Sequence, residues 1–457
     1  ARGNDDVITF NDGLISRHIK GGDGDDAINL NGGRVAKNVF GESGEDTITL
    51  DGTRVSGTVS GGDGGDTIML TSGSVLNVSG AADDDNITLN GATVSGTISG
   101  GDNVDTITLT SGSVANVMGD AGEDNITLDG ATVSADISGG DDIDTITLTS
   151  GSAVNVNGDA GDDNISLNGA TVSGTISGGD NVDTITLTSG SVANVMGDAG
   201  EDNITLDGAT VSADISGGDD IDTITLTSGS AVNVNGDAGD DSITLDGTMV
   251  SGNIFGGDDS DTINLTSGSV DGDVAWGAGD DTMVIDATSL ATVAGDLLGG
   301  TGADTLNMDG GDFSANTINM GDDDDTINLN GGVAGVILGG AGNDNAHWHG
   351  ITSVTSIDLG ADDDTLVIYN DADLAAATDV VDGGAGNDTI TFDNATGTVN
   401  EIAGWESLGV QNASDVIIAT VSAIGIVDAF VTDSIATLKN AIISNDVNVD
   451  NSTVILA

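Results

Sequence analysis

The sequence contains no cysteine and no proline, aromatic residues make up only 2% of its 457 residues, and basic side chains are scarce. Without cysteine, no disulfide links parts of the chain, and the redox compartment cannot be read from cysteine usage. Seven Lys and Arg side chains stand against 76 Asp and Glu side chains, which gives a formal net charge of -69. Nucleic acids and anionic membrane surfaces are themselves polyanions, so this charge excludes both as default partners.

Long apolar runs are also scarce. The longest, residues 416 to 431, is too short to span a bilayer and contains Asp428, so we expect no membrane insertion. No N-terminal signal peptide is visible. High charge with few aromatics can indicate disorder, but 37% of the residues are apolar, and many are Ile, Leu or Val at regular intervals. The sequence therefore predicts a packed interior, with cations neutralising the surrounding acids.

A glycine- and aspartate-rich nonapeptide recurs along the chain. Residues 21–29 read Gly-Gly-Asp-Gly-Asp-Asp-Ala-Ile-Asn, and residues 299–307, 339–345 and 383–391 follow the same scheme, G-G-x-G-x-D-x-U-x, where U is a large apolar residue. The Asp that closes each acidic turn, called the closing Asp below, recurs mostly every 19 or 20 residues. The closing Asp residues are Asp6, Asp26, Asp46, Asp66, Asp85, Asp105, Asp124, Asp144, Asp163, Asp183, Asp202, Asp222, Asp241, Asp261, Asp281, Asp304, Asp325, Asp344, Asp364 and Asp388. Such a series is the signature of a repeat protein.

One repeat predicts two strands and two turns. Residues 106–110 alternate Thr-Ile-Thr-Leu-Thr, which places Ile107 and Leu109 inside and the threonines outside. Residues 111–113 predict a turn, and a second short strand, such as residues 133–137 in the next repeat, leads back to an acidic turn. One such coil cannot bury its own apolar face, but a stack of coils can.

The predicted fold is therefore all-β: a right-handed parallel β-solenoid of about twenty coils of 19–20 residues. We assign residues 1–394 to the solenoid. Residues 395–457 leave the repeat pattern and are predicted to form a small C-terminal region that caps the last coil, assembles with another molecule or carries a secretion signal.

The nonapeptide resembles the calcium-binding repeat of RTX proteins, the hemolysin-type family, and the coil length is similar to the 19-residue solenoids of bacterial RTX adhesins. The resemblance implies that the closing Asp residues are the side-chain ligands of many Ca²⁺ ions, shared with turn carbonyls of neighbouring coils. Only one turn of each coil carries the motif, so we predict a single calcium ladder along one edge. Alternate coils replace a motif glycine with Asn or Asp, which makes Asp102, Asp141, Asp180 and Asp219 candidate additional ligands.

The resemblance also implies export by type I secretion. Because calcium is scarce in the cytosol and plentiful outside, we expect the chain to be unfolded before export and to fold outside the cell. The expected location is extracellular or on the cell surface of a bacterium or archaeon. The chain has no Cys and only three His, and the repeat uses its acids. We therefore expect a structural protein without enzymatic activity.

Basic residues are confined to the start of the chain, apart from Lys439; they are Arg2, Arg17, Lys20, Arg34, Lys37 and Arg54. This polarity, with a repeat that starts at once, predicts head-to-tail association into a homopolymer such as a filament, surface layer or matrix fibre. Residues 416–423 or 447–456 are the predicted receiving surface. The alternative is an extender or ice-binding region of a large adhesin, since Thr-x-Thr pairs such as Thr106 and Thr108 would stack in outward rows.

Overall fold

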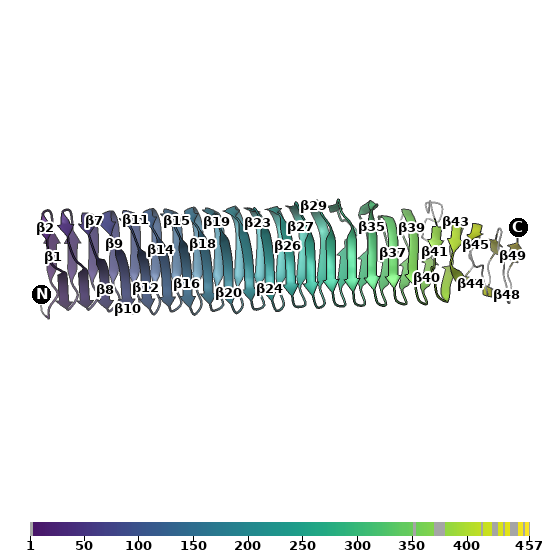
Figure 1. Ribbon diagram of the computed structural model, residues 1–457, viewed down its shortest axis with the longest axis horizontal. Helices are drawn as coiled ribbons and strands as arrows, with labels where there is room; N and C mark the ends of the chain where they lie inside the picture. Colours follow the sequence, from purple (N-terminus) through teal and green to yellow (C-terminus); the bar gives the residue numbers. More distant parts are fainter. Residues whose placement is uncertain are drawn as a thin grey trace. The chain divides into compact units, whose positions relative to one another are not determined.

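The structure is a computed structural model that describes residues 3–350, 353–369, 380–412, 415–422, 428–432, 435–438, 447–450 and 453–456. In these residues every regular element is a β-strand, and strands of successive coils pair in parallel (Figure 1). The predicted all-β parallel β-solenoid of about twenty turns is confirmed. No helix in the described part of the chain is long and apolar enough to cross a membrane.

The chain divides into two compact units within strand β25 (Thr223–Ala231). Unit 1 comprises residues 1–223 and 227–231, and unit 2 comprises residues 224–226 and 232–457. In each unit, the strand that follows a closing Asp belongs to a first parallel sheet. The strand that leads into the next acidic turn belongs to a second.

In unit 1 most strands of the first sheet have Ile and Leu at their buried positions. Its strands are β1 (Val7–Phe10), β2 (Leu14–Ile15), β4 (Ala27–Leu30), β5 (Arg34–Val35), β7 (Thr47–Val55), β9 (Thr67–Val75), β11 (Asn86–Val94), β13 (Thr106–Val114), β15 (Asn125–Val133), β17 (Thr145–Ala153), β19 (Asn164–Val172), β21 (Thr184–Val192) and β23 (Asn203–Val211). The second sheet consists of β3 (Ile19–Asp23), β6 (Val39–Ser43), β8 (Thr58–Asp63), β10 (Asn77–Ala82), β12 (Thr97–Asp102), β14 (Asn116–Ala121), β16 (Asp136–Asp141), β18 (Asn155–Ala160), β20 (Thr175–Asp180), β22 (Asn194–Ala199) and β24 (Asp214–Asp219).

Unit 2 repeats this arrangement. Its first sheet consists of β27 (Ser242–Val250), β29 (Thr262–Val270), β31 (Thr282–Ile285), β32 (Thr292–Val293), β34 (Thr305–Met308), β36 (Thr326–Leu329), β38 (Asn345–Trp348), β40 (Thr365–Tyr369), β42 (Asp388–Asp393), β44 (Trp405–Gln411), β46 (Asp428–Thr432) and β48 (Val447–Asp450). The second sheet consists of β26 (Asn233–Ala238), β28 (Ile254–Asp258), β30 (Val274–Ala278), β33 (Leu297–Thr301), β35 (Asp312–Asp322), β37 (Val333–Ala341), β39 (Ser353–Ala361), β41 (Val380–Asp382), β43 (Thr396–Ala403), β45 (Asp415–Ser422), β47 (Ile435–Leu438) and β49 (Thr453–Leu456).

The core lies between the two sheets of a coil and follows the predicted alternation. Ile107 and Leu109 are fully buried, and Val114 and Val117 close the same coil from the end of β13 and the start of β14. Each of these side chains stacks on its equivalent in the neighbouring coil, as Ile107 does on Ile126. Burial of apolar surface between coils is therefore the main stabilising contribution, and it depends on stacking.

The reversal between the two strands of a coil lies a few residues later in the chain than the sequence predicted. Residues 111–113 stay inside β13, where Gly112 adopts a φ of 101° and bends the strand without ending it. In the next coil the reversal falls at Ser134 and Ala135, and the second strand is residues 136–141, not 133–137. The prediction was wrong because a glycine in the left-handed region can kink a strand while the coil-to-coil hydrogen bonds continue.

Parallel pairing continues beyond residue 394. Strands β43 to β49 pair with the coils before them in the same alternation of sheets. Residues 416–422 lie in β45, and Val416 and Ile418 are buried. Residues 423 and 451–452 of the predicted receiving segments lie outside the described residues. The predicted role of residues 395–457 in capping, assembly or secretion stays a prediction.

Candidate metal ladder in the acidic turns

Every closing Asp from Asp26 to Asp388 is buried, with an exposed fraction between 0 and 3%. Asp6, in the first described coil, is half-buried. Each of these residues directly precedes a strand of the first sheet, or begins it in the case of Asp388, so its side chain points to the same interior as the apolar side chains that follow. Buried carboxylates are rare unless they are paired or coordinate a cation. Their repetition at one position of the coil is therefore the feature to be explained.

One carboxylate oxygen of each closing Asp binds the backbone of the preceding coil. The N–H of one closing Asp donates to Oδ1 of the next, as Asp105 does to Asp124 at 2.7 Å. In unit 1 the same bond links consecutive closing Asp residues from Asp6 to Asp222, at 2.6 to 2.8 Å. In unit 2 it links those from Asp241 to Asp388, at 2.7 to 3.0 Å. The closing Asp residues thus form a hydrogen-bonded ladder within each unit.

The other oxygen, Oδ2, is buried and has no hydrogen-bond partner among the described residues. This holds for Asp26, Asp46, Asp66, Asp85, Asp105, Asp124, Asp144, Asp163, Asp183, Asp202, Asp261, Asp281, Asp304, Asp325, Asp344, Asp364 and Asp388. A buried carboxylate oxygen without a donor carries a large desolvation penalty. The fold therefore needs a proton or a cation at this oxygen.

A bare glycine and a carbonyl oxygen of the next coil lie beside Oδ2 at most closing Asp residues. At Asp281, Asp325 and Asp364 the position of this glycine is held by Trp276, Met320 and Leu359. A Cβ built on Gly100 would overlap both Oδ2 of Asp105 and the carbonyl oxygen of Gly119 in the next coil. The same holds for Gly139, which lies against Asp144 and Gly158. Two acceptor oxygens thus converge where only a glycine leaves room, and two acceptors without a donor repel each other unless a cation or a proton lies between them.

Burial raises the pKa of these carboxyl groups. The pKa is about 8 for Asp144 and Asp183 and about 6 for Asp163 and Asp202, so the two alternating coil types differ. Desolvation is the largest cause in each case; the N–H bond from the preceding coil opposes it, and neighbouring carboxylates raise the pKa further. In the absence of a cation, the ionised ladder is therefore costly at neutral pH.

These residues fit a hard cation such as Ca²⁺. Calcium takes six to eight oxygen ligands in flexible geometry, including backbone carbonyls. Among the described residues no three His, Cys, Asp or Glu side chains come together as a metal cluster. A site in an acidic turn would therefore combine the Oδ2 of a closing Asp with carbonyl oxygens. Asp102 and Asp141, the candidate additional ligands of two coils, are exposed at the ends of β12 and β16, whereas the closing Asp is buried.

Sequence reasoning missed one member of the ladder. The N–H of Asp388 donates to Oε2 of Glu406 at 2.9 Å, where every earlier rung has an Asp. Glu406 escaped notice because it does not follow a Gly-rich turn. The signal that could have found it is its distance of 18 residues from Asp388, close to one coil.

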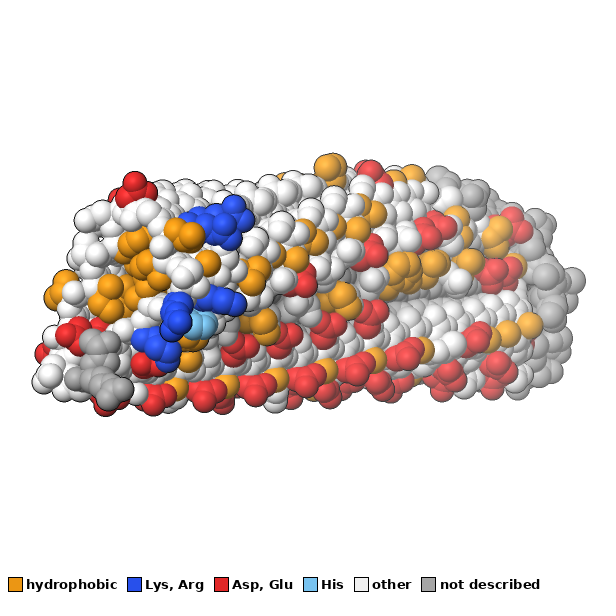
Figure 2. Space-filling view, turned by 60° about the vertical axis from the view of Figure 1, so that its left-hand side comes forward, with side chains coloured by type: hydrophobic (Ala, Val, Ile, Leu, Met, Phe, Trp, Pro, Cys, Tyr) orange, Lys and Arg blue, Asp and Glu red, His pale blue; other side chains and the backbone are white. Residues whose placement is uncertain are grey.

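Basic side chains gather on the first coils of unit 1, and acidic side chains form rows along the surface (Figure 2). Lys20 forms an ion pair with Glu42 and lies over the ring of Phe40, 5.3 Å from its centroid. Arg34 and Arg54 are partners in the register of β5 and β7, and both are exposed. Such a pair is unfavourable unless an anion is close.

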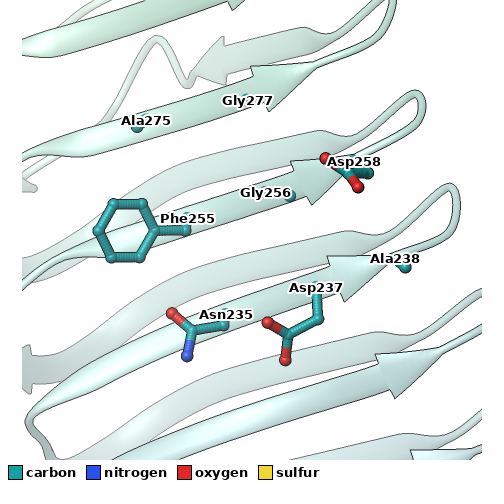
Figure 3. Close-up of a pocket in the computed structure, with 9 residues that line it drawn as sticks. Asn235, Asp237, Ala238, Phe255, Gly256, Asp258, Ala275 and Gly277 are labelled. Carbon is teal, nitrogen blue, oxygen red and sulfur yellow. The ribbon is translucent and has the colours of Figure 1, made fainter.

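A shallow hollow of about 580 Å³ lies on the outer face of the second sheet in unit 2. Phe255, 39% exposed, borders it between Asn235 of β26 and Ala275 of β30, its register partners (Figure 3). Asp258 lies at the end of β28, away from the ring (Figure 3). The hollow results from a large ring beside small residues, and its lining does not bring a nucleophile and a base together.

Comparison with known proteins gives one distant structural likeness. A crystal structure of a hyperactive, Ca²⁺-dependent, β-helical antifreeze protein from an Antarctic bacterium matches 66% of this chain and 83% of its own chain, at 20% sequence identity and a TM-score of 0.41. No protein-family model matches the sequence. No curated protein sequence matches it either. The likeness is too distant to assign a ligand or a function to this chain.

Proposed function

We propose that this protein is an extracellular structural protein whose fold is stabilised by Ca²⁺ bound along its acidic turns. The observation that carries the proposal is the buried, unpartnered Oδ2 of the closing Asp beside a carbonyl oxygen of the next coil, as for Asp105 and Gly119. When bound, calcium would neutralise the carboxylate and attract both oxygens. Protons compete for the same position, because the pKa of Asp105 is raised to about 7 by its burial.

A structural role follows from how such a fold would respond to calcium. Each coil buries its apolar side chains mainly against its neighbours, so the folding of one coil favours the folding of the next. Neutralisation of many acidic turns at once would make that folding steep in calcium concentration. The chain would then be unfolded at the low calcium level of a cytosol and folded outside the cell.

The test is a calcium titration followed by far-UV circular dichroism. Metal-free protein at pH 8 should lack most of the β signal, and calcium should restore it cooperatively. A β spectrum and a melting temperature that are the same in excess chelator and in calcium would overturn the proposal. Melting in chelator at pH 5 separates calcium from protons, because a proton-stabilised ladder would be folded there without metal.

Self-association belongs to the same proposal. The charge pattern supports it: Arg34 and Arg54 lie on adjacent strands, and neither forms an ion pair with a described acidic residue, while the acidic turns carry a large excess of negative charge. Contact between the basic coils of one molecule and the acidic surface of another would reduce the repulsion between like charges on both surfaces. The expected product is a homopolymer.

A second candidate function, ice binding, rests on ordered rows of hydroxyl groups. Thr108, Thr127 and Thr147 are register partners on the outer face of the first sheet of unit 1. The parallel row alternates, with Asn125 between Thr106 and Thr145. Such a row is also what an exposed strand favours without any ligand.

The test for ice binding is inhibition of ice recrystallisation by the calcium-loaded protein. Thr127→Glu interrupts the row, and Thr175→Glu on the second sheet is the matched control. Activity that Thr127→Glu alone reduces would support this function. Absence of activity in the wild type, or equal loss in both variants, would exclude it.

A further inference from the structure

The ladder ends at Glu406, and an irregularity in the strand pairing brings the Glu406 side chain to that position. Asp388 pairs with Trp405 in the register of β42 and β44, but Thr389 pairs with Ser407. Glu406 is therefore the extra residue of an irregularity between the two strands. An extra residue of this kind re-aims a side chain. The longer Glu side chain then accepts the N–H of Asp388 at 2.9 Å, as Oδ1 of the next closing Asp does elsewhere.

The coil of Asp388 also contains the glycine and the carbonyl oxygen that lie beside Oδ2 of other closing Asp residues. Oδ2 of Asp388 is fully buried and has no hydrogen-bond partner among the described residues. A Cβ on Gly383 would come within 3.1 Å of this Oδ2 and within 3.0 Å of the carbonyl oxygen of Gly404. The same glycine, carboxylate oxygen and carbonyl oxygen recur here as at Gly100, with Gly404 in place of the next motif glycine. An acceptor-lined position thus exists at Asp388 although no closing Asp follows it.

Glu406 brings a second carboxylate to this position. The hydrogen bond from the Asp388 N–H to Oε2 of Glu406, at 2.9 Å, holds this second carboxylate against the turn that carries the first. Two carboxylates held together beside a carbonyl oxygen need a cation between them. Ser407 pairs with Asp428 in the next coil, and the residue before Asp428 in the sequence is Val427, which has no carboxylate. The series of carboxylates therefore stops at Glu406.

We infer that Glu406 is the last carboxylate ligand of the ladder, and that a Ca²⁺ bound by Asp388 and Glu406 fastens β44 to the coil before it. This inference rests on the proposed calcium-dependent function. It assigns a metal-binding role to a residue outside the nonapeptide repeats. It also means that the fold beyond residue 404 depends on calcium although it lacks the motif.

The test is hydrogen exchange of the full chain at increasing calcium concentrations, read separately for peptides from residues 380–412 and from residues 100–220. Glu406→Gln keeps an oxygen that can accept the Asp388 N–H but removes the charge. In this variant the calcium concentration for half-protection of residues 380–412 should rise about tenfold, while residues 100–220 should not change. Glu123→Gln, which alters an exposed acid of an ordinary acidic turn, is the control and should leave both midpoints unchanged.

The outcomes separate the two proposals. If Glu406→Gln titrates like the wild type while Glu406→Ala loses protection even without calcium, Glu406 is only a hydrogen-bond acceptor and the inference is wrong. If calcium changes the exchange of no peptide in the wild type, the proposed function itself fails. If calcium protects residues 100–220 but not residues 380–412, the ladder binds calcium and ends before Asp388, which also overturns the inference.

Discussion

The backbone N–H of Asp124 donates a hydrogen bond to Oδ1 of Asp144 at 2.7 Å, so the carboxylate of one coil holds the backbone of the coil before it. Oδ2 of the same carboxylate has no partner and lies against Gly139 and the carbonyl oxygen of Gly158. One side chain thus has two separate tasks. A substitution that keeps the first and removes the second distinguishes them.

Asp144→Asn is that substitution, and we predict that its effect changes sign with calcium. The amide keeps an acceptor for the Asp124 N–H but has no charge. In calcium the variant should need about tenfold more calcium for half-folding, because a ligand charge is lost. In chelator at pH 8, where the wild type should lose most of its β signal, the variant should keep more of it, because it removes a buried charge that nothing compensates. Far-UV circular dichroism under both conditions measures this.

Asp129→Asn is the matched control. Asp129 is exposed and accepts hydrogen bonds from the hydroxyls of Thr149 and Ser150, each at 3.0 Å. Substitution there should change the free energy of unfolding by less than about 0.5 kcal/mol in either condition. A destabilisation of both variants by the same amount, with and without calcium, would contradict a special role for the closing Asp.

The raised pKa values predict how the metal-free protein responds to pH. The pKa of Asp66 is about 8 in the fold, and that of Asp85 is about 7, against an ordinary value of 3.8; burial is the main cause of both shifts. The folded state therefore binds more protons than the unfolded state between these values. Stability should be greatest below the ordinary value and should fall as the pH rises through about 6 to 8.

This pH dependence is measurable by melting metal-free protein in calcium-depleted buffers, without a chelator whose affinity itself varies with pH. In saturating calcium the trend should be absent or reversed, since protons then compete with the metal for the same oxygens. A metal-free protein that becomes more stable as the pH rises from about 5 to about 8 would contradict the assignment of buried, protonatable carboxyl groups.

Magnesium should replace calcium poorly. The position beside Oδ2 of Asp105 is bordered by a carbonyl oxygen of another coil, so its ligands belong to backbone segments with their own spacing. Magnesium demands near-ideal octahedral geometry at shorter distances and loses its water reluctantly, whereas calcium tolerates irregular sites. We expect that the magnesium concentration for half-folding exceeds that of calcium by more than about tenfold. Equal midpoints would indicate general charge screening in place of coordination.

The fold and the positions of the closing Asp residues were predictable because each is determined by a regular spacing of residues in the sequence. The 19–20-residue spacing predicted stacking, and the alternation around Ile107 and Leu109 predicted which side chains are buried. The position of the second turn was not predictable from Gly112, because a glycine with positive φ either ends a strand or kinks it. The hydrogen bonds between coils determine whether the strand ends at the glycine or continues through a kink.

The candidate site was predictable only in part for the same kind of reason. The sequence indicated which carboxylates repeat, but not that Oδ1 would bind the preceding coil while Oδ2 would face a carbonyl oxygen. Asp102 and Asp105 are both acids of one turn, yet one is exposed and the other buried. Glu406 could not be found from a motif because an extra residue in the strand pairing brings it to the ladder. Its ligand role stays a prediction.

Arg34→Gln with Arg54→Gln should weaken self-association of the calcium-loaded protein. The two arginines are exposed register partners in the first coils of unit 1, so their loss removes charge that would meet the acidic surface of a second molecule. Thr93→Glu with Thr132→Glu is the matched control: it changes the net charge by the same amount at exposed positions farther along the first sheet.

Sedimentation velocity at low and high salt measures the distribution of assembled species. Assembly that is lost in the arginine variant, kept in the control and reduced by salt would fit association between the basic coils and an acidic surface. Wild-type protein that stays monomeric in calcium at low salt, or equal assembly in both variants, would exclude that contact.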